Sequence, residues 1–133
     1  MKDKRIAITG GAGFIGSNLA EELATGNNVT IIDDLSTGKK ENIASLLEKD
    51  NVKFTQGSIL DLKLLQESFR GVDFVFHQAA LPSVPRSIED PKATNEANIT
   101  GTLNVLLAAR DNHVKKVMQT TCRKEIENMV AIL

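Results

Sequence analysis

The sequence predicts an α/β domain, a doubly wound parallel sheet of about five strands with helices on both faces. Short apolar runs rich in β-branched residues alternate with helical patterns along the chain. This alternation is typical of parallel strands joined by right-handed crossovers. The chain has 133 residues, enough for one hydrophobic core but not for a two-domain enzyme.

Composition and charge exclude several classes of protein. The chain is 41% hydrophobic and 25% charged, which is ordinary for globular domains. Its net charge is -1 and its basic residues are scattered, so we expect no nucleic-acid partner. No stretch is apolar enough for a membrane span, and residues 2–5 are not followed by the apolar core of a signal peptide. We therefore expect a cytoplasmic protein without a membrane partner.

Apolar runs of four to seven residues identify the strands. The first run, at residues 5–9, ends on glycines, and the second, at residues 29–32, ends on two aspartates. Both are typical of buried strands in a parallel sheet. The predicted strands are residues 5–9, 29–32, 52–55, 72–77 and 114–120.

Apolar residues three or four positions apart identify the helices. After the first strand, Phe14, Ile15, Leu19 and Leu23 follow this spacing, and Gly26 supplies the stop. Similar patterns precede or follow each later strand, and Asp61 is expected to begin the third helix, where an acid suits the helix dipole. The predicted helices are residues 14–24, 39–49, 62–69 and 93–112.

Three glycines, Gly10, Gly13 and Gly16, lie between the first strand and the first helix. In this context the first permits a tight turn, the second lets backbone approach a pyrophosphate, and the third lets helix and strand pack closely. Free N–H groups near Phe14 and Ile15 would then face the phosphates. The pattern predicts a Rossmann-type dinucleotide site, the alternative being a turn with no ligand.

Asp33 ends the second strand, where a carboxylate can hold ribose hydroxyls. An acid there repels a 2′-phosphate, so NAD is expected rather than NADP. Lys39 and Lys40 would weaken this preference for NAD. The alternative is that they are only the solvent-exposed start of the second helix. We expect the strand order 3-2-1-4-5, with the ligand at the carboxyl ends near the switch between strands 1 and 4.

These segments resemble the extended short-chain dehydrogenases/reductases, which act mostly on nucleotide sugars. The resemblance covers residues 4–117 and begins with the string TGGAGFIG at residues 9–16. The segment HQAALPSVPRS at residues 77–87 is most similar to the epimerase branch, which includes UDP-glucose and UDP-N-acetylglucosamine 4-epimerases. The resemblance implies that NAD is the cofactor and a nucleotide sugar the substrate.

The resemblance also implies a set of binding residues. Residues 34–38 would hold the adenosine ribose, residues 57–61 would lie beside the adenine, and residues 77–80 would lie along the cofactor. Ser58 stands where the family has an acid, so the backbone of Ile59 is the expected adenine contact. The implied cofactor-binding residues are Gly10, Gly13, Phe14, Ile15, Gly16, Asp33, Asp34, Leu35, Ser36, Thr37, Gly38, Ser58, Ile59, Gln78, Ala79, Ala80 and Asn98, with Ser83 as the substrate contact.

The family's chemistry requires a residue type that this chain lacks. In such epimerases, a Tyr in a Y-x-x-x-K pair takes the 4-hydroxyl proton while NAD takes and returns the C4 hydride. The chain has no tyrosine, and Cys122 stands where the family has a Ser or Thr. We therefore expect the dinucleotide half alone, without catalytic residues, through truncation or a shifted reading frame. The alternatives are a stand-alone NAD-binding module or sensor, a non-catalytic remnant, and a nucleotide-sugar 4,6-dehydratase fragment.

The amino-acid pattern of the chain changes after Met118. We expect residues 1–121 to form an incomplete NAD-binding domain and residues 122–133 to form an amphipathic helical tail. Without a sixth strand, the fifth would expose an edge. We expect the tail or a second copy of the chain to cover this edge, in a homodimer.

The remaining polar candidates have weaker signals. His77 is expected to be a positioned strand-end residue rather than a base. No histidine has Cys or carboxylate companions at ligand spacing, so no metal site is expected. Arg86 and Ser87 are secondary candidates for contacts with phosphate or sugar, and Cys122 is expected to be structural.

Overall fold

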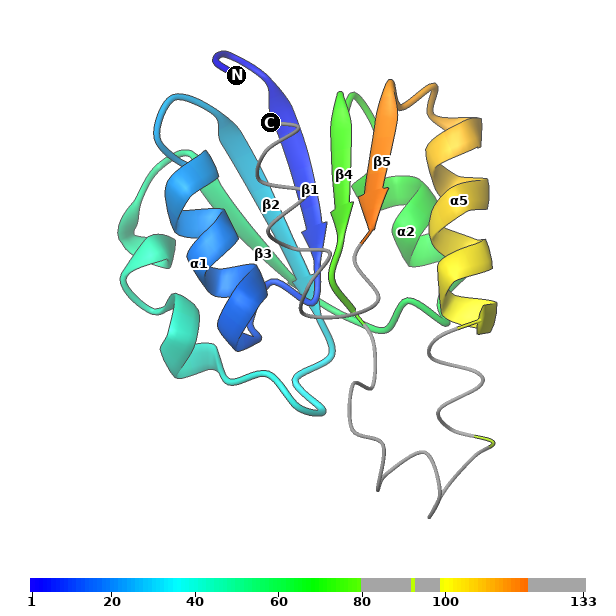
Figure 1. The fold of residues 1–133 in the computed structure, drawn as a ribbon, viewed down its shortest axis with the longest axis horizontal. Coiled ribbons are helices and arrows are strands. Elements are labelled where there is room, and N and C mark those ends of the chain that lie inside the picture. The colour runs from blue at the N-terminus through cyan, green and yellow to red at the C-terminus, as the bar shows by residue number, and fades with distance from the viewer. Residues whose placement is uncertain (80–91, 93–98, 120–133) are drawn as a thin grey trace.

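Five parallel strands form one sheet in the order β3-β2-β1-β4-β5 (Figure 1). This is the predicted order, and the doubly wound α/β class is confirmed. The computed structural model describes residues 1–79, 92 and 99–119. Predictions for the other residues, namely Ala80, Ser83, Arg86, Ser87, Asn98, Cys122 and the tail 122–133, lie outside the described residues.

The elements follow the alternation expected from the sequence. The strands are β1 Arg5–Thr9, β2 Asn28–Asp33, β3 Val52–Gln56, β4 Phe74–His77 and β5 Lys116–Gln119. The helices are α1 Phe14–Leu23, α2 Leu62–Ser68 and α5 Gly101–Asp111, and the 3₁₀ turns are η1 Lys40–Ile43 and η2 Leu46–Glu48. Within the described residues, no helix is long and apolar enough to cross a membrane.

Two hydrophobic clusters lie on opposite faces of the sheet. Ile6 and Ile8 of β1 pack in the cluster that includes residues of α1, η1 and η2. Ala7, between them, packs in the cluster that includes residues of α2 and α5. Successive side chains of a strand point to opposite faces, so a strand with apolar residues at consecutive positions contributes to both clusters.

The predicted helix at residues 39–49 is wrong. The segment forms two short 3₁₀ turns, and its two buried anchors, Ile43 and Leu46, are three residues apart. Ile43 ends the first turn and Leu46 begins the second, so the two anchors lie in different turns. The segment also bonds to the glycine turn through Lys39 and Asn42. These bonds to a distant segment hold the chain in a form other than the α-helix.

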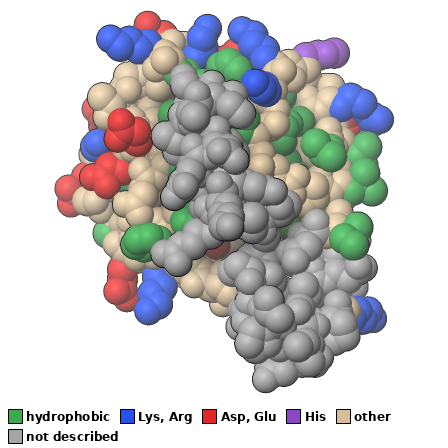
Figure 2. Space-filling model, in the orientation of Figure 1, with side chains coloured by type: hydrophobic (Ala, Val, Ile, Leu, Met, Phe, Trp, Pro, Cys, Tyr) green, Lys and Arg blue, Asp and Glu red, His purple; other side chains and the backbone are tan. Residues whose placement is uncertain are grey.

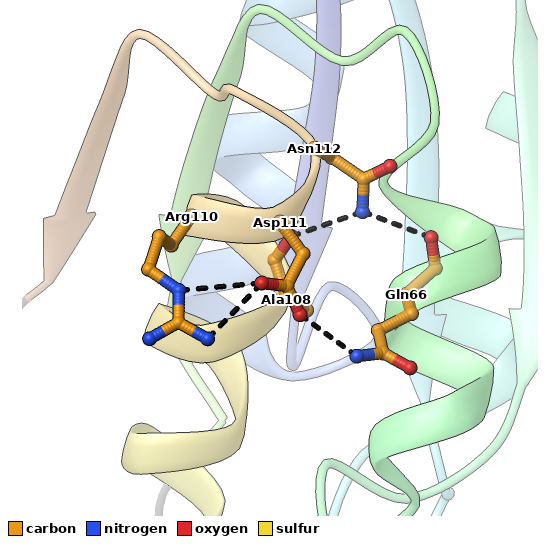
Figure 3. Close-up of polar contacts among 5 residues, drawn as sticks. All are labelled: Gln66, Ala108, Arg110, Asp111 and Asn112. Atoms are coloured by element: carbon orange, nitrogen blue, oxygen red, sulfur yellow. Dashed lines mark hydrogen bonds and ion pairs between the residues drawn. The ribbon is translucent and has the colours of Figure 1, made fainter.

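The last helix, α5, lies within its predicted range of residues 93–112. Residues 99–100 form a π-turn that leads into α5, and residues 93–98 lie outside the described residues. Asn112 ends α5 as expected: its side-chain Nδ2 donates to Ala108 O and to Gln66 O, each over 2.9 Å (Figure 3). The side chain of Gln66 in turn donates to Asp111 Oδ2 over 2.9 Å. These bonds fix the end of α5 against α2.

A second amide holds the end of α1 near β3. Asn51 Nδ2 donates to Ala24 O over 2.6 Å and to Asn27 O over 2.7 Å. Asn27 Nδ2 donates to Leu23 O over 2.9 Å. Carbonyl groups at helix C-termini lack intrahelical donors, and side-chain amides supply them here.

Candidate functional site

The glycine turn follows β1 and lies against the end of β4. Gly10 has a φ of 72°, a left-handed conformation that favours glycine. A Cβ at this position would lie 2.6 Å from Ala79 N. Gly10 N also donates to Ile32 O over 2.7 Å. The turn is therefore enclosed between the carboxyl ends of β2 and β4.

The other two glycines of the motif have different surroundings. A Cβ at Gly16 would overlap the Gly10 carbonyl oxygen and lie 2.8 Å from Gly11 Cα, so helix α1 packs directly on the turn. Among the described residues, a Cβ at Gly13 would meet only Gly10 O, at 3.4 Å. The described part of the chain thus leaves Gly13 open on its outer side, as an approaching ligand requires.

Within the part of the chain that the structure describes, the first backbone N–H groups of α1 have no acceptor. The first helical bond runs from Ser17 N to Gly13 O over 2.9 Å, so the N–H groups of Phe14, Ile15 and Gly16 precede the first intrahelical partner. Gly13 supplies no side-chain cap, and the first turn carries no acidic residue. The Phe14 side chain is 80% exposed. Together with the helix dipole, these donors form a site suited to an anion such as a phosphate.

Asp33 lies beside this turn with its carboxylate fixed. Its Oδ2 accepts from Ala12 N over 2.9 Å, and its Oδ1 accepts from Leu35 N over 2.8 Å. The residue is buried. Each carboxylate oxygen has room for a second donor in principle, so Asp33 can hold the loop and still accept a bond from a ribose hydroxyl.

The loop after β2, residues 34–38, packs on the glycine turn. A Cβ at Gly38 would lie 2.9 Å from Ala12 C and from Asp33 Oδ2. Asp34 Oδ1 accepts from Ser36 N over 2.9 Å, while Ser36 and Thr37 are exposed. The Lys40 ammonium lies over the Phe54 ring, 5.9 Å from its centroid, in a cation–π contact.

The segment after β3 brings Ser58 and Ile59 to the same end of the sheet. Gly57 N donates to Asp33 O over 3.1 Å. Ser58 Oγ accepts from Leu60 N over 3.1 Å, and Ile59 is buried, with its carbonyl accepting from Asn104 Nδ2 over 3.0 Å. The side chain of Ile59 therefore serves the core, and only its backbone N–H is a candidate ligand contact.

His77 ties three elements together at the end of β4. Its Nδ1 lies 2.6 Å from Thr9 Oγ1, and its Nε2 lies 2.9 Å from Thr102 Oγ1 in α5. Burial lowers the pKa of His77 to about 4, because the charged imidazolium is poorly solvated there. His77 is thus neutral near pH 7 and positions β1, β4 and α5, in agreement with the expected strand-end role.

The end of β4 leads from this network to the glycine turn. Gln78 N donates to Thr9 O over 2.9 Å, and Ala79 N donates to Thr9 Oγ1 over 3.4 Å. The structure thus brings the described residues of the predicted site to the carboxyl end of the sheet. Sequence reasoning missed Thr102 and Asn42, which contact His77 and the turn only through the tertiary fold.

A separate groove lies elsewhere on the described surface. It runs between α2 and the β2–β3 side of the sheet, with lining residues that include Arg5, Lys53, Glu67 and Arg70. None of the motif glycines lines it. Its mixed charges do not select a ligand type, so the glycine turn is the stronger candidate site.

Comparison with known proteins identifies the family. A family model described as the NAD dependent epimerase/dehydratase family matches residues 6–129. The chain belongs to this family. Membership of the NAD-dependent epimerase/dehydratase family accounts for the strand order and for the glycine turn at the end of β1.

Individual members of the family show the extent of the similarity. The UDP-glucose 4-epimerase of Mycolicibacterium smegmatis is 41% identical over 120 residues, which cover 88% of this chain and 38% of that protein. The structure of a UDP-N-acetylglucosamine 4-epimerase from Methanobrevibacter ruminantium M1 is 42% identical with a TM-score of 0.83, covering 88% of this chain and 37% of that one.

A family member with a different activity is nearly as similar. The structure of a dTDP-glucose 4,6-dehydratase from Streptomyces venezuelae, with NAD bound, is 36% identical with a TM-score of 0.82. The matched region covers 85% of this chain and 38% of the dehydratase chain. The chain therefore spans less than two-fifths of the length of these three relatives.

The described residues fit the family's cofactor. The unpaired N–H groups of Phe14 and Ile15 suit a pyrophosphate, and the open side of Gly13 leaves room for it. The fixed carboxylate of Asp33 suits the hydroxyls of an adenosine ribose. The glycine turn and the end of β2 therefore supply both kinds of contact at one end of the sheet.

Proposed function

We propose that this chain is the NAD-binding part of a UDP-sugar 4-epimerase. The observation that carries the proposal is the start of α1, where a row of backbone donors without a side-chain cap lies beside a fixed carboxylate. In this proposal the N–H groups of Phe14 and Ile15 bind the pyrophosphate. Asp33 and the loop 34–38 bind the adenosine ribose, and the backbone of Ile59 lies beside the adenine.

The chain's own residues bind and orient the cofactor. Bound NAD would supply the acceptor for the hydride from C4 of the sugar. Residues 78–79, which follow β4, lie along the cofactor in this proposal. Neutral His77 holds the end of β4 against β1 and α5. Asp33 disfavours a 2′-phosphate by charge repulsion, so NAD is preferred to NADP.

The choice of reaction within the family rests on the segment at residues 77–87, which resembles the epimerase branch. Sequence identity does not separate the reactions, because a UDP-N-acetyl-alpha-D-glucosaminuronate decarboxylase is 41% identical to this chain, as is one of the epimerases. We therefore propose 4-epimerisation of a UDP-sugar, with a 4,6-dehydratase of nucleotide sugars as the second candidate. Binding of NAD is common to both, and the 133-residue chain contains no tyrosine to act as the family's base.

Calorimetric titration and a turnover assay together test the proposal. The 133-residue chain is expected to bind NAD more tightly than NADP and to leave UDP-glucose and UDP-N-acetylglucosamine unconverted. Absence of NAD binding would contradict the cofactor site. Conversion of either sugar would contradict the expectation that this chain lacks the base.

We further propose a homodimer in which a second copy of the chain covers the edge of β5. Among the described strands, β5 pairs with β4 alone. The neighbouring helix α5 presents exposed apolar side chains, visible at the right of Figure 2. They include Leu103 and Leu106, which are 54% and 48% exposed. Light scattering at increasing concentration is expected to show twice the monomer mass, and a constant monomer mass would contradict the dimer.

A further inference from the structure

Ala12, in the middle of the glycine turn, is held on both sides by the segment that follows β2. Its N–H donates to Asp33 Oδ2 over 2.9 Å. Its carbonyl oxygen accepts two bonds, from Asn42 Nδ2 over 2.8 Å and from Lys39 N over 3.0 Å. Ala12 is fully buried. Both peptide groups that flank Ala12 therefore have partners outside the turn.

These two peptide groups set the direction of the donors at the start of α1. Because a peptide group is planar, a bond to its N–H or its carbonyl restrains the whole group. Asp33 restrains the group before Ala12, and Asn42 restrains the group between Ala12 and Gly13. The next peptide N–H belongs to Phe14, the first of the donors without an intrahelical partner.

The amide of Asn42 comes from the adenosine side of the site. Asn42 lies in η1, shortly after the loop 34–38. At Gly38, this loop is so close to the turn that a Cβ would lie 2.9 Å from the Ala12 carbonyl carbon. The loop and the turn are therefore a single packed unit, joined by the bond from Asn42 to Ala12.

We infer that Asn42 is a positioning residue for the cofactor. Its side-chain amide holds the glycine turn in the form that receives the pyrophosphate and joins this turn to the loop that receives the adenosine ribose. Asn42 acts through the Ala12 carbonyl and not by touching the cofactor. The inference rests on the proposed function, since it concerns the same NAD site.

The test compares two substitutions of Asn42 with a matched control. Asn42→Ala removes the donor, and Asn42→Asp replaces it with an oxygen that repels the Ala12 carbonyl. Asn51→Ala is the control, because Asn51, like Asn42, donates from its side-chain amide to the backbone. Its acceptors are the carbonyls of Ala24 and Asn27, at the end of α1 away from the turn. All three variants are made in the 133-residue chain and are compared at a temperature where each is folded.

Calorimetry with NAD gives the first measurement. Asn42→Ala is expected to weaken NAD binding about tenfold, the equivalent of one hydrogen bond, and Asn42→Asp by more. Asn51→Ala is expected to lower the melting temperature while the Kd for NAD stays within about twofold of the wild type. A variant Asn42→Ala that loses stability but binds NAD like the wild type would overturn the inference.

Amide hydrogen exchange gives a second measurement that needs no cofactor. The N–H groups of Ala12 and Lys39 are expected to exchange faster in Asn42→Ala than in the wild type or in Asn51→Ala. Equal rates in all three proteins would overturn the inference. If the wild type fails to bind NAD, the proposed function fails, and the exchange rates still decide whether Asn42 holds the turn.

Discussion

Helix α1 follows β1 and helix α2 follows β3 of the same sheet, but the starts of the two helices satisfy their backbone donors differently. At α2, the Asp61 side chain accepts from Leu64 N over 3.1 Å and caps the helix. At α1, Gly13 has no side chain, and no acid occupies the first turn. A capped start favours helix stability, whereas an uncapped start leaves its donors available to an anion. The capped start of α2 therefore stabilises the fold, and the uncapped start of α1 is the proposed binding site.

The close packing of α1 on the turn gives the largest expected effect. Gly16→Ala places a Cβ against backbone atoms of Gly10 and Gly11, which cannot move aside as a flexible side chain would. We expect a loss of about 4 kcal/mol in the free energy of unfolding, at the high end for a single substitution. Urea unfolding measures it. Gly13→Ala is the control, and an equal loss in both variants would show that packing does not distinguish the two glycines.

The start of α5 is held by His77 rather than by a cap, and this gives a pH dependence. The folded pKa of His77 is about 4, against 6.5 for the free side chain. Between these values the unfolded chain binds more protons, so the free energy of unfolding falls as pH falls from 6.5 towards 4. The expected loss is about 3 kcal/mol.

Unfolding curves at several pH values measure this dependence. His77→Asn is expected to show a flatter profile over the same range. His113→Asn is the control, since Asn also tolerates the left-handed backbone of His113, with φ 56°, and it should keep the wild-type profile. A wild-type profile in His77→Asn would mean that His77 is not the titrating group.

Giving α1 a cap like that of α2 tests the comparison directly. The backbone of Gly13 is extended, with φ -76° and ψ 172°, so Gly13→Asp is tolerated and can cap the helix. We expect stability to rise by a few tenths of a kcal/mol. NAD binding is expected to weaken about 100-fold, or about 2.7 kcal/mol, because a carboxylate replaces the phosphate at the helix start. Calorimetry that finds unchanged NAD affinity would exclude this helix start as the pyrophosphate site.

Removing the cap of α2 gives the smallest expected effect. Asp61→Ala leaves the Leu64 N–H without its side-chain acceptor, and we expect a loss of about 1 kcal/mol in the free energy of unfolding. The Kd for NAD is expected to stay within about twofold of the wild type, because the Asp61 side chain bonds to Leu64 N and is not among the proposed cofactor contacts. A larger change in NAD affinity than in stability would mean that α2 takes part in binding.

The features that the sequence predicted well are those with a local physical cause. Apolar runs identified β1 and β2, the glycine spacing identified the turn, and the acid after the second run identified Asp33. The segment 39–49 was predicted incorrectly because its apolar spacing is compatible with a helix, while Lys39 and Asn42 bond to Ala12 across the fold. Local spacing carries no information about such bonds.

The sequence by itself determined the order of elements and the turn that left-handed Gly10 makes possible, and it indicated the residues proposed to bind NAD. These follow from side-chain size, backbone freedom and periodicity, which act within a few residues. Only the tertiary structure decided that Asn42 reaches Ala12 and that His77 is neutral between Thr9 and Thr102. Such outcomes depend on burial and on hydrogen bonds between residues far apart in the chain, and these exist only when the sheet and its helices are assembled.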